Sequence, residues 1–335
     1  MNASVRSIAV YGAGSWGTAL ALQLARNGID VLMWDINPTQ VEQLNQAREN
    51  TRYLPGVPLP DNLRVCADLQ TVAQFSNYHL VVVPSHGFRA LLQQLQPLLT
   101  EQDALIWATK GLELETGKLL HQVVSEALPQ CAGYGVVSGP TFAAEVARGL
   151  PTAMTVAATQ TTLAQAIAEA FHGTNYRMYF SQDIVGVELG GAVKNVLAIA
   201  AGISDGLGFG ANARAAIITR GLVEMSRLGA KLGAQAETFM GLAGMGDLVL
   251  TCTDNQSRNR RLGLALGQGA DMDSAIAAIG QAVEGAKSAR SIGLLAAQAD
   301  VEMPICQQVY RILYEQLPPL QAVQELIARA MKAEF

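Results

Sequence analysis

Short apolar runs alternate with helix-forming segments over the first half of the chain. Between these strand-like runs, helices are predicted for residues 18–27, 39–49, 88–99, 117–128 and 163–171. Strands that alternate with helices in this way predict a mostly parallel sheet with helices on both faces, a doubly wound (Rossmann-like) α/β fold. The predicted strands are residues 8–11, 29–34, 63–66, 79–84, 104–108, 134–138, 152–158 and 176–180.

The pattern changes near residues 181–187, and we predict no strand beyond that point. Glycine-rich turns at residues 206–210 and 241–246 separate long apolar runs with helical character. We therefore expect an α/β domain over residues 1–182 and an all-α domain over residues 183–335, with the second covering a site at the carboxyl ends of the strands. The predicted helices are residues 187–204, 214–232, 258–266, 283–298 and 305–315.

The loop after the first strand carries the most informative motif, Gly12-Ala-Gly14-Ser-Trp-Gly17. In a strand–loop–helix context, the three glycines allow a tight turn, close approach of a pyrophosphate and close packing of helix on strand. An ordinary glycine turn is the alternative. Asp35, at the end of the second strand, favours the dinucleotide interpretation, because an acid there holds the adenosine ribose.

The composition narrows the function classes further. Of 335 residues, 50% are hydrophobic and 15% charged, as in a well-packed globular protein, and the formal charge of -5 argues against a nucleic-acid partner. No apolar run reaches the roughly 18 residues of a membrane span, so we expect neither a span nor a signal peptide. The four histidines have no metal-ligand spacing. The cysteines form no Cys-x-x-Cys pair and predict reduced thiols in a cytoplasmic protein: Cys66, Cys131, Cys252 and Cys306.

Two lysines and one aspartate are candidates for proton chemistry. Lys194 lies in an otherwise apolar helical run, where it is either a structurally paired lysine or a proton donor whose pKa is lowered by burial or by a second cation. Lys110, after the fifth strand, is that second cation or a solvated loop lysine. Asp247 follows two glycines and either caps a helix or orients a lysine.

The segment that opens the helix at residues 258–266 is a candidate anion site. Ser257 is a suitable N-cap, and Arg258 and Asn259 fall in the first turn beside unpaired backbone N–H groups. An arginine fork at a helix N-terminus suits a phosphate dianion. A solvated basic turn and a nucleic-acid patch are the alternatives.

Seven motifs then occur in order: Gly-Ala-Gly-Ser-Trp-Gly, Pro-Ser-His, Ala-Thr-Lys-Gly-Leu, Ser-Gly-Pro-Thr-Phe-Ala, Leu-Gly-Gly-Ala-Val-Lys-Asn, Gly-Phe-Gly-Ala-Asn and Asn-Gln-Ser-Arg-Asn. This set, from about residue 8 to about residue 314, resembles the bacterial NAD(P)-dependent glycerol-3-phosphate dehydrogenases. The resemblance implies reversible reduction of dihydroxyacetone phosphate to sn-glycerol 3-phosphate with NAD(H) or NADP(H), for glycerophospholipid synthesis.

The resemblance also assigns roles to individual residues. It implies that Lys194 is the general acid/base and that Asp247 supports the lysines. The expected substrate contacts are Lys110, Gly139, Thr141, Lys194, Asp247, Ser257, Arg258 and Asn259. The expected cofactor contacts are Gly12, Gly14, Ser15, Trp16, Gly17, Asp35, Lys110, Ala143, Arg258, Ala282 and Glu284.

The segment after the second strand departs from members of the family that favour NADPH, in which polar or basic residues meet the adenosine 2′-phosphate. Here Asp35 would repel that phosphate, and Ile36 offers it no hydrogen bond. A close anionic pair costs up to ~4 kcal/mol at 4 Å and an effective dielectric of 20. We therefore expect NADH to be used at least as well as NADPH.

Two other functions stay open on the sequence alone. A 3-hydroxyacid dehydrogenase also joins a glycine-loop domain to helices through a lysine, but it needs a carboxylate site. A non-catalytic nucleotide-sensing protein is expected to have lost Lys194, Lys110 or Arg258, all of which are present.

The apolar helical half also favours a homodimer.

Overall fold

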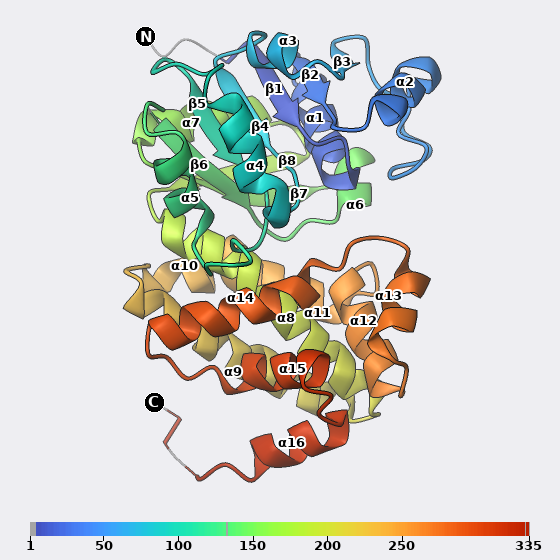
Figure 1. The fold of residues 1–335 in the computed structure, drawn as a ribbon, viewed down its shortest axis with the longest axis vertical. Coiled ribbons are helices and arrows are strands. Elements are labelled where there is room, and N and C mark those ends of the chain that lie inside the picture. Colours follow the sequence, from blue (N-terminus) through green and yellow to red (C-terminus); the bar gives the residue numbers. More distant parts are fainter. Residues whose placement is uncertain (1–4, 132, 332, 335) are drawn as a thin grey trace.

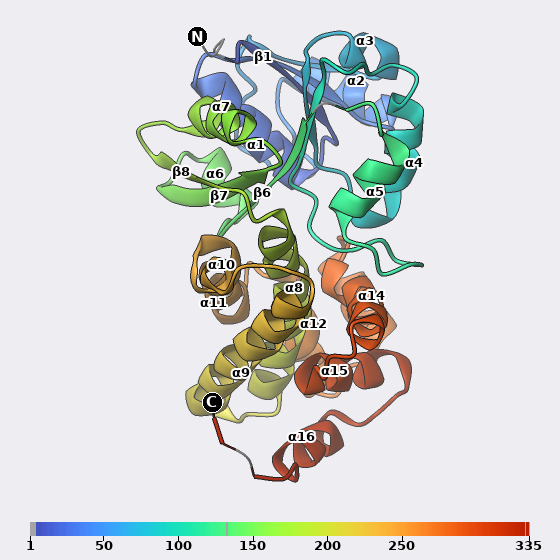
Figure 2. The same cartoon turned by 90° about the vertical axis from the view of Figure 1, so that its left-hand side faces the viewer.

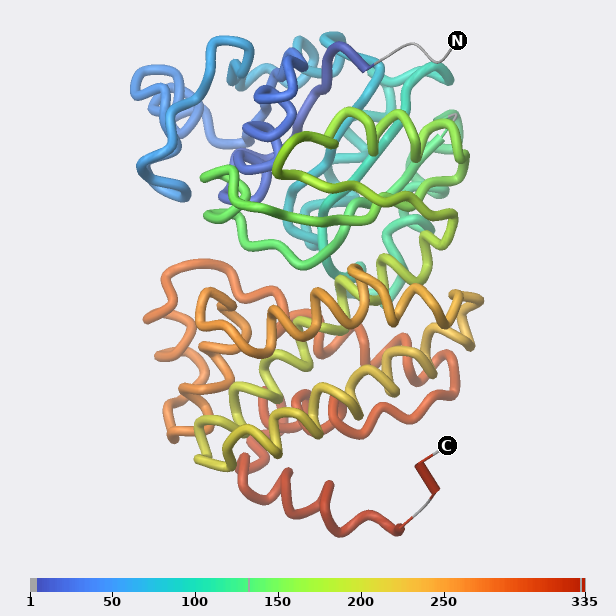
Figure 3. Tube along the Cα trace, turned by 180° about the vertical axis from the view of Figure 1, so that it is seen from behind, coloured from blue at the N-terminus to red at the C-terminus, as the bar shows by residue number. Residues whose placement is uncertain are grey.

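The structure is a computed structural model that describes residues 5–131, 133–331 and 333–334. An α/β half and a helical half lie end to end, as Figure 1 shows. The chain trace in Figure 3 passes from the first half to the second without returning to the sheet.

One sheet forms the centre of the α/β half, with strand order β3-β2-β1-β4-β5-β6-β7-β8. Neighbouring strands are parallel except β6 and β7, which are antiparallel. The strand order reverses direction at β1, and in such sheets ligands bind outside the carboxyl ends of the strands at this point, here β1 and β4. The strands are β1 Ser7–Tyr11, β2 Asp30–Trp34, β3 Leu63–Cys66, β4 Tyr78–Val81, β5 Ala104–Trp107, β6 Gly133–Ser138, β7 Thr152–Ala158 and β8 Tyr176–Ser181.

Helices cover both faces of this sheet, which confirms the predicted fold class. Figure 2 shows α1 (Ser15–Arg26) and α7 (Thr161–Phe171) on one side, and α4 (Ser85–Leu95) and α5 (Leu120–Ala127) on the other. Alternate strand residues therefore enter two separate cores: Val10 packs on the α1 side and Tyr11 on the α4 side. The remaining helices of this half are α2 Pro38–Ala47, α3 Leu69–Ala73 and α6 Ala143–Ala147.

The second half contains helices and no strand among its described residues, and it is built around α8 (Ile184–Gly206). By length and hydropathy α8 could span a membrane, but its apolar side chains are buried among the other helices, as in a core helix. Glu188 of α8 accepts hydrogen bonds from the backbone and ring of His121, at the start of α5. The other elements are α9 Gly210–Lys231, α10 Ala236–Met240, a π-helical turn η1 Leu242–Gly246, α11 Asp247–Thr253, α12 Arg258–Gly267, α13 Met272–Ile279, α14 Glu284–Gln298, α15 Pro304–Tyr314 and α16 Pro319–Ile327.

Two sequence predictions about local structure are wrong. The helix expected over residues 117–128 begins only at Leu120, because Gly117 has a positive φ of 72° and the buried side chains of Leu112 and Leu119 hold the preceding loop in the helical core. The glycine-rich turn expected at residues 241–246 is instead η1, which continues into α11. The sequence pattern does not predict the short helices, since each offers fewer than three turns of periodicity: α3, α6, α10, α11, α13 and α16.

Candidate active site

The glycine loop has the geometry of a dinucleotide site. Gly12 has a φ of 111°, which disfavours any other residue, and a Cβ on Gly17 would collide with the carbonyl oxygen of Gly12. Gly14 is the N-cap of α1, and no side chain caps this helix. The first N–H groups of α1 therefore stay available to an anion.

A nicotinamide dinucleotide fits this loop. A Cβ built on Gly14 meets nothing within 4 Å, so the glycine faces open space that a pyrophosphate can fill. Asp35 lies beside the loop and accepts a hydrogen bond from the backbone N–H of Ala13 at 2.9 Å. The Trp16 side chain donates to the carbonyl of Ala108 at the end of β5, at 3.2 Å. The loop thus contacts the residues that follow β2 and β5.

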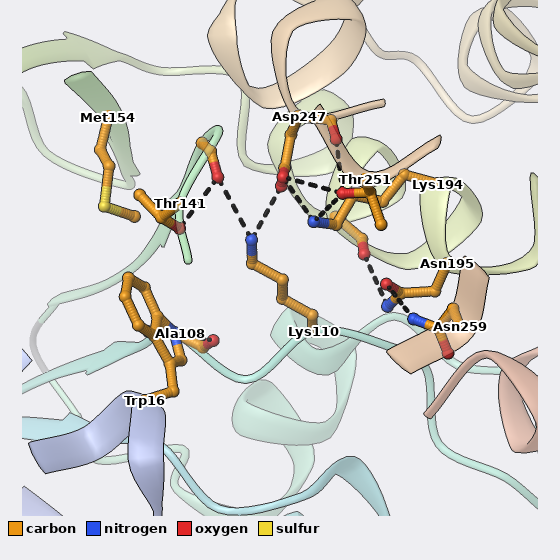
Figure 4. Close-up of polar contacts among 12 residues, drawn as sticks. Trp16, Ala108, Lys110, Thr141, Met154, Lys194, Asn195, Asp247, Thr251 and Asn259 are labelled. Carbon is orange, nitrogen blue, oxygen red and sulfur yellow. Dashed lines mark hydrogen bonds and ion pairs between the residues drawn. The ribbon is translucent and has the colours of Figure 1, made fainter. Parts of the chain in front are cut away.

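The two lysines converge on one buried carboxylate (Figure 4). Lys194 Nζ donates to Asp247 Oδ1 and, at 2.9 Å, to Thr251 Oγ1. Lys110 Nζ lies 2.8 Å from Asp247 Oδ2 and 3.3 Å from the carbonyl of Gly139. Asp247 has no exposed surface, and Lys194 is 5% exposed.

The backbone brings these side chains together. A Cβ on Gly190 would collide with the Ala243 carbonyl, so this glycine lets α8 approach η1 and the start of α11 at backbone distance. Lys110 comes from the loop after β5, and its ammonium lies 5.9 Å from the centre of the Trp16 ring. The lysine pair therefore joins the helical half to the sheet and to the cofactor loop.

Burial changes the pKa of Lys194. Desolvation lowers the pKa of Lys194 to about 8; the charge of Asp247 opposes the shift, and the neighbouring Lys110 adds to it. A lysine with this pKa changes protonation near neutral pH, as a general acid/base requires. The geometry agrees with both interpretations of Lys194, a structurally paired lysine and a proton donor.

A polar network connects the cluster to the start of α12. The Asn195 side chain accepts a hydrogen bond from Asn259 at 2.9 Å, and Asn259 in turn accepts one from the backbone N–H of Gly285 on α14, also at 2.9 Å. Ser257 is the N-cap of α12, as expected, and accepts from the backbone N–H of Arg260. Arg258 is half-buried and reaches Gln281 at 3.3 Å.

The remaining predicted residues lie around this network. Thr141 donates to the Gly139 carbonyl at 3.1 Å, after the end of β6, and Ala143 is the first residue of α6. Ala282 is exposed just before α14, and Glu284 is the first residue of that helix. Burial raises the pKa of Glu284, while the cations Arg258, Lys110 and Lys194 lower it. Glu284 thus faces the same cations that the substrate and cofactor are expected to meet.

Thr251 and Asn195 are the polar residues of the cluster that sequence reasoning missed. Thr251 is four residues after Asp247, so the two share one face of α11, and Asn195 directly follows Lys194. Those spacings were the available signals. Among the described residues, no group of three or more histidine, cysteine, aspartate or glutamate side chains is arranged to hold a metal ion.

Comparison with known proteins agrees with this geometry over nearly the whole chain. Residues 7–164 match the family model for the N-terminus of NAD-dependent glycerol-3-phosphate dehydrogenase, and residues 183–324 match the model for its C-terminus. The glycerol-3-phosphate dehydrogenase [NAD(P)+] of Thioalkalivibrio sulfidiphilus is 58% identical over 98% of both chains. That of Citrobacter koseri is 55% identical over 100% of this chain and 99% of its own.

A solved structure gives the same result. The crystal structure of glycerol-3-phosphate dehydrogenase from Coxiella burnetii matches with a TM-score of 0.94 and 49% identity, covering 97% of this chain and 99% of the other. Identity at this level over the full length leaves no reason to prefer a hydroxyacid dehydrogenase or a non-catalytic protein. The chain belongs to the family of NAD(P)-dependent glycerol-3-phosphate dehydrogenases.

Proposed function

We propose that Lys194 is the general acid/base of this dehydrogenase in the interconversion of dihydroxyacetone phosphate and sn-glycerol 3-phosphate. The observation that carries the proposal is the buried Lys194 ammonium, which shares Asp247 with Lys110. When bound, the nicotinamide cofactor supplies or accepts the hydride at C2 of the substrate. Lys194 donates a proton to the C2 oxygen during reduction and removes it during oxidation.

Lys110 and Asp247 have supporting roles in this mechanism. The Lys110 ammonium stabilises the negative charge that grows on the C2 oxygen, because it lies beside Lys194 in a site largely closed to water. Asp247 holds both ammonium groups at fixed positions and offsets their repulsion. Thr251 accepts from Lys194 and restricts the direction of its proton.

We assign the substrate phosphate to the first turn of α12. The Asn259 side chain is occupied by Asn195 and Gly285, so its contribution is the backbone N–H, together with that of Arg258. The Arg258 guanidinium, which donates to Gln281 at 3.3 Å, adds the charged fork. Binding energy from the phosphate then orients the carbonyl beside Lys194.

The cofactor contacts proposed for this chain start at the glycine loop. Gly12, Gly14 and Gly17 shape the loop, and Ser15 and Trp16 at the start of α1 face the phosphates and the nicotinamide end. The proposed contacts on the opposite side are Lys110, Ala143, Arg258, Ala282 and Glu284. The electrostatic interaction of Glu284 with Arg258 and Lys110 supports their placement around one site.

We further propose that NADH is used at least as well as NADPH. Both Asp35 oxygens accept backbone hydrogen bonds, from Ala13 at 2.9 Å and from Asn37 at 3.0 Å, so the carboxylate is held at the ribose position. The N-terminus of α2 offers a phosphate little: Pro38 has no N–H, and the Asn37 side chain accepts from the next two backbone N–H groups. Ile36 is 77% exposed and apolar.

Several wider proposals accompany this one. We propose a cytoplasmic enzyme of glycerophospholipid synthesis, with residues 1–182 and 183–335 as separate domains. The four free cysteines are compatible with a reducing compartment. We also propose a homodimer, supported by the large exposed apolar side chains of the helical half, which include Met240, Leu320 and Ile327.

The testing experiment is the loss of reduced-nicotinamide absorbance on addition of dihydroxyacetone phosphate, run in parallel with NADH and NADPH. Turnover that depends on Lys194 supports the mechanism, and a kcat/KM for NADH at least equal to that for NADPH supports the cofactor assignment. A higher kcat/KM for NADPH than for NADH would overturn the cofactor assignment and leave the mechanism intact.

A further inference from the structure

The basic run Arg258–Arg261 contains three arginines that meet three different environments. Arg258 is half-buried at the tip of α12, Arg261 is exposed, and Arg260 is 8% exposed. A buried arginine is costly unless its donors are paired, so the partners of Arg260 are informative.

The Arg260 side chain bonds to three separate parts of the helical half. Its Nε donates to the carbonyl of Cys252 in α11 at 3.1 Å, and its Nη1 donates to Asn255 in the connecting loop. Its Nη2 lies 2.5 Å from Asp205 near the end of α8. The guanidinium therefore links α11, α8 and the loop that leads to Ser257.

Asp205 is itself fixed from a second side. Arg214 of α9 donates to both of its oxygens, at 2.9 and 2.8 Å. The carboxylate is 9% exposed and neutralised by two guanidinium groups. It therefore provides a rigid anchor for Arg260.

The backbone of Arg260 is fixed as well. A Cβ on Gly202 of α8 would collide with the Arg260 carbonyl, so the two helices meet at backbone distance here. The Arg260 N–H donates to Ser257 Oγ at 3.2 Å. Both ends of the residue thus hold the first turn of α12 relative to α8, the helix that carries Lys194.

We infer that Arg260 is a positioning residue for phosphate recognition: it holds Ser257, Arg258 and the first N–H groups of α12 at a fixed distance from Lys194, without touching the substrate. This inference rests on the proposed assignment of the substrate phosphate to α12. The three arginines of the basic run then have different roles: Arg258 binds the phosphate, Arg260 positions the first turn of α12, and Arg261 is solvated.

The test compares a phosphorylated substrate with its non-phosphorylated counterpart. Arg260→Lys keeps the charge but replaces the planar fork with one nitrogen, which cannot reach all three partners. We expect kcat/KM for dihydroxyacetone phosphate to fall by about 100-fold, as for a misplacement of roughly 1 Å, while kcat/KM for dihydroxyacetone stays unchanged. The matched control is Arg261→Lys, one residue along, which should change neither value.

A second variant keeps the test decisive if Arg260→Lys does not fold. Asp205→Asn preserves the shape of the anchor and removes its charge. It should lower the ratio of kcat/KM for dihydroxyacetone phosphate to kcat/KM for dihydroxyacetone, but to a smaller extent. The melting temperature of each variant reports whether it remains folded. A parallel fall with both substrates, or no change with either, would show that Arg260 does not position the phosphate site.

Arg258→Ala separates failure of this inference from failure of the assignment beneath it. The expected result is that both Arg258→Ala and Arg260→Lys lose the preference for dihydroxyacetone phosphate over dihydroxyacetone. Loss of this preference in Arg258→Ala alone would refute the positioning role of Arg260 and keep the phosphate site. An unchanged preference in both variants would refute the phosphate site on α12, and with it the positioning role of Arg260.

Discussion

The glycine loop offers a ligand its backbone, whereas the lysine cluster offers side chains gathered from three segments. Gly12, Gly14 and Gly17 are neighbours in sequence, and the loop they form depends on φ angles and on the absence of side chains. Lys110 and Asp247 are 137 residues apart, and each depends on a different element for its position. The loop is thus a local structure, and the cluster exists only when the helical half is assembled against the sheet.

This difference has a functional consequence. Backbone N–H groups suit the pyrophosphate, which every dinucleotide shares and which does not change during the reaction. The proton must move during the reaction, and this requires a titratable side chain with a shifted pKa. Substitutions in the two regions should therefore separate binding of the cofactor from chemistry.

The largest expected effect is at Lys194. Lys194→Ala should lower kcat by about 10²- to 10⁴-fold, because it removes a positioned proton donor. The dissociation constant of NADH should not change, since the glycine loop is untouched. Steady-state kinetics and NADH fluorescence titration measure the two quantities. Lys231→Ala, an exposed lysine at the end of α9, is the control. An undiminished kcat in Lys194→Ala would refute the assignment.

The converse experiment is at Gly17. Gly17→Ala places a methyl group on the Gly12 carbonyl, which must push α1 away from the loop. Overpacking of this kind costs about 1–3 kcal/mol, so NADH should bind about 5- to 150-fold more weakly.

Gly14→Ala is the matched variant, because open space surrounds the added methyl group in the protein alone. It should leave the melting temperature unchanged and still weaken NADH binding, whereas Gly17→Ala should lower both. If Gly17→Ala binds NADH as tightly as the parent enzyme, close packing of α1 does not matter for the site.

The smallest expected effect is at the adenosine end. Ile36→Arg adds a cation beside the position of the 2′-phosphate, where the parent residue is 77% exposed. One charge-assisted hydrogen bond contributes about 1.5–3 kcal/mol, partly cancelled by Asp35, so the ratio of kcat/KM for NADPH to that for NADH should rise about tenfold. Ile36→Ala should leave the ratio unchanged. An equal ratio in both variants would mean that Ile36 does not face the phosphate.

The same contrast explains what the sequence could predict. The alternating pattern predicts each strand of the sheet, and the glycine loop is recognisable because its signal is contiguous. Lys194 is conspicuous as a lysine in an apolar helix, but its partner Thr251 and the Asn195–Asn259–Gly285 network depend on which helices pack together. The late start of α5 is also a tertiary effect, since Leu112 and Leu119 are buried in the helical core.

The burial of Asp247 is a second feature that the sequence does not predict. Its sequence neighbours predict a helix N-cap, but the N-cap of α11 is Gly246, and Asp247 is the first residue of the helix. Its complete burial between two lysines follows from the contact of α8 with η1, which local propensity does not encode. Its supporting role in catalysis, like that of Glu284 toward the cofactor, stays a prediction.

The most direct test of the account is the pH dependence of kcat/KM in both directions. Lys194 must be protonated to reduce dihydroxyacetone phosphate and neutral to oxidise sn-glycerol 3-phosphate, and burial lowers its pKa to about 8. Reduction should therefore be constant below about pH 8 and fall above it, whereas oxidation should fall below about pH 8 and level off above it. Two limbs that bend in opposite senses at a shared pKa are the predicted result. Limbs that bend in the same sense, or no ionisation between pH 7 and 9, would contradict the assignment of Lys194 as the proton donor.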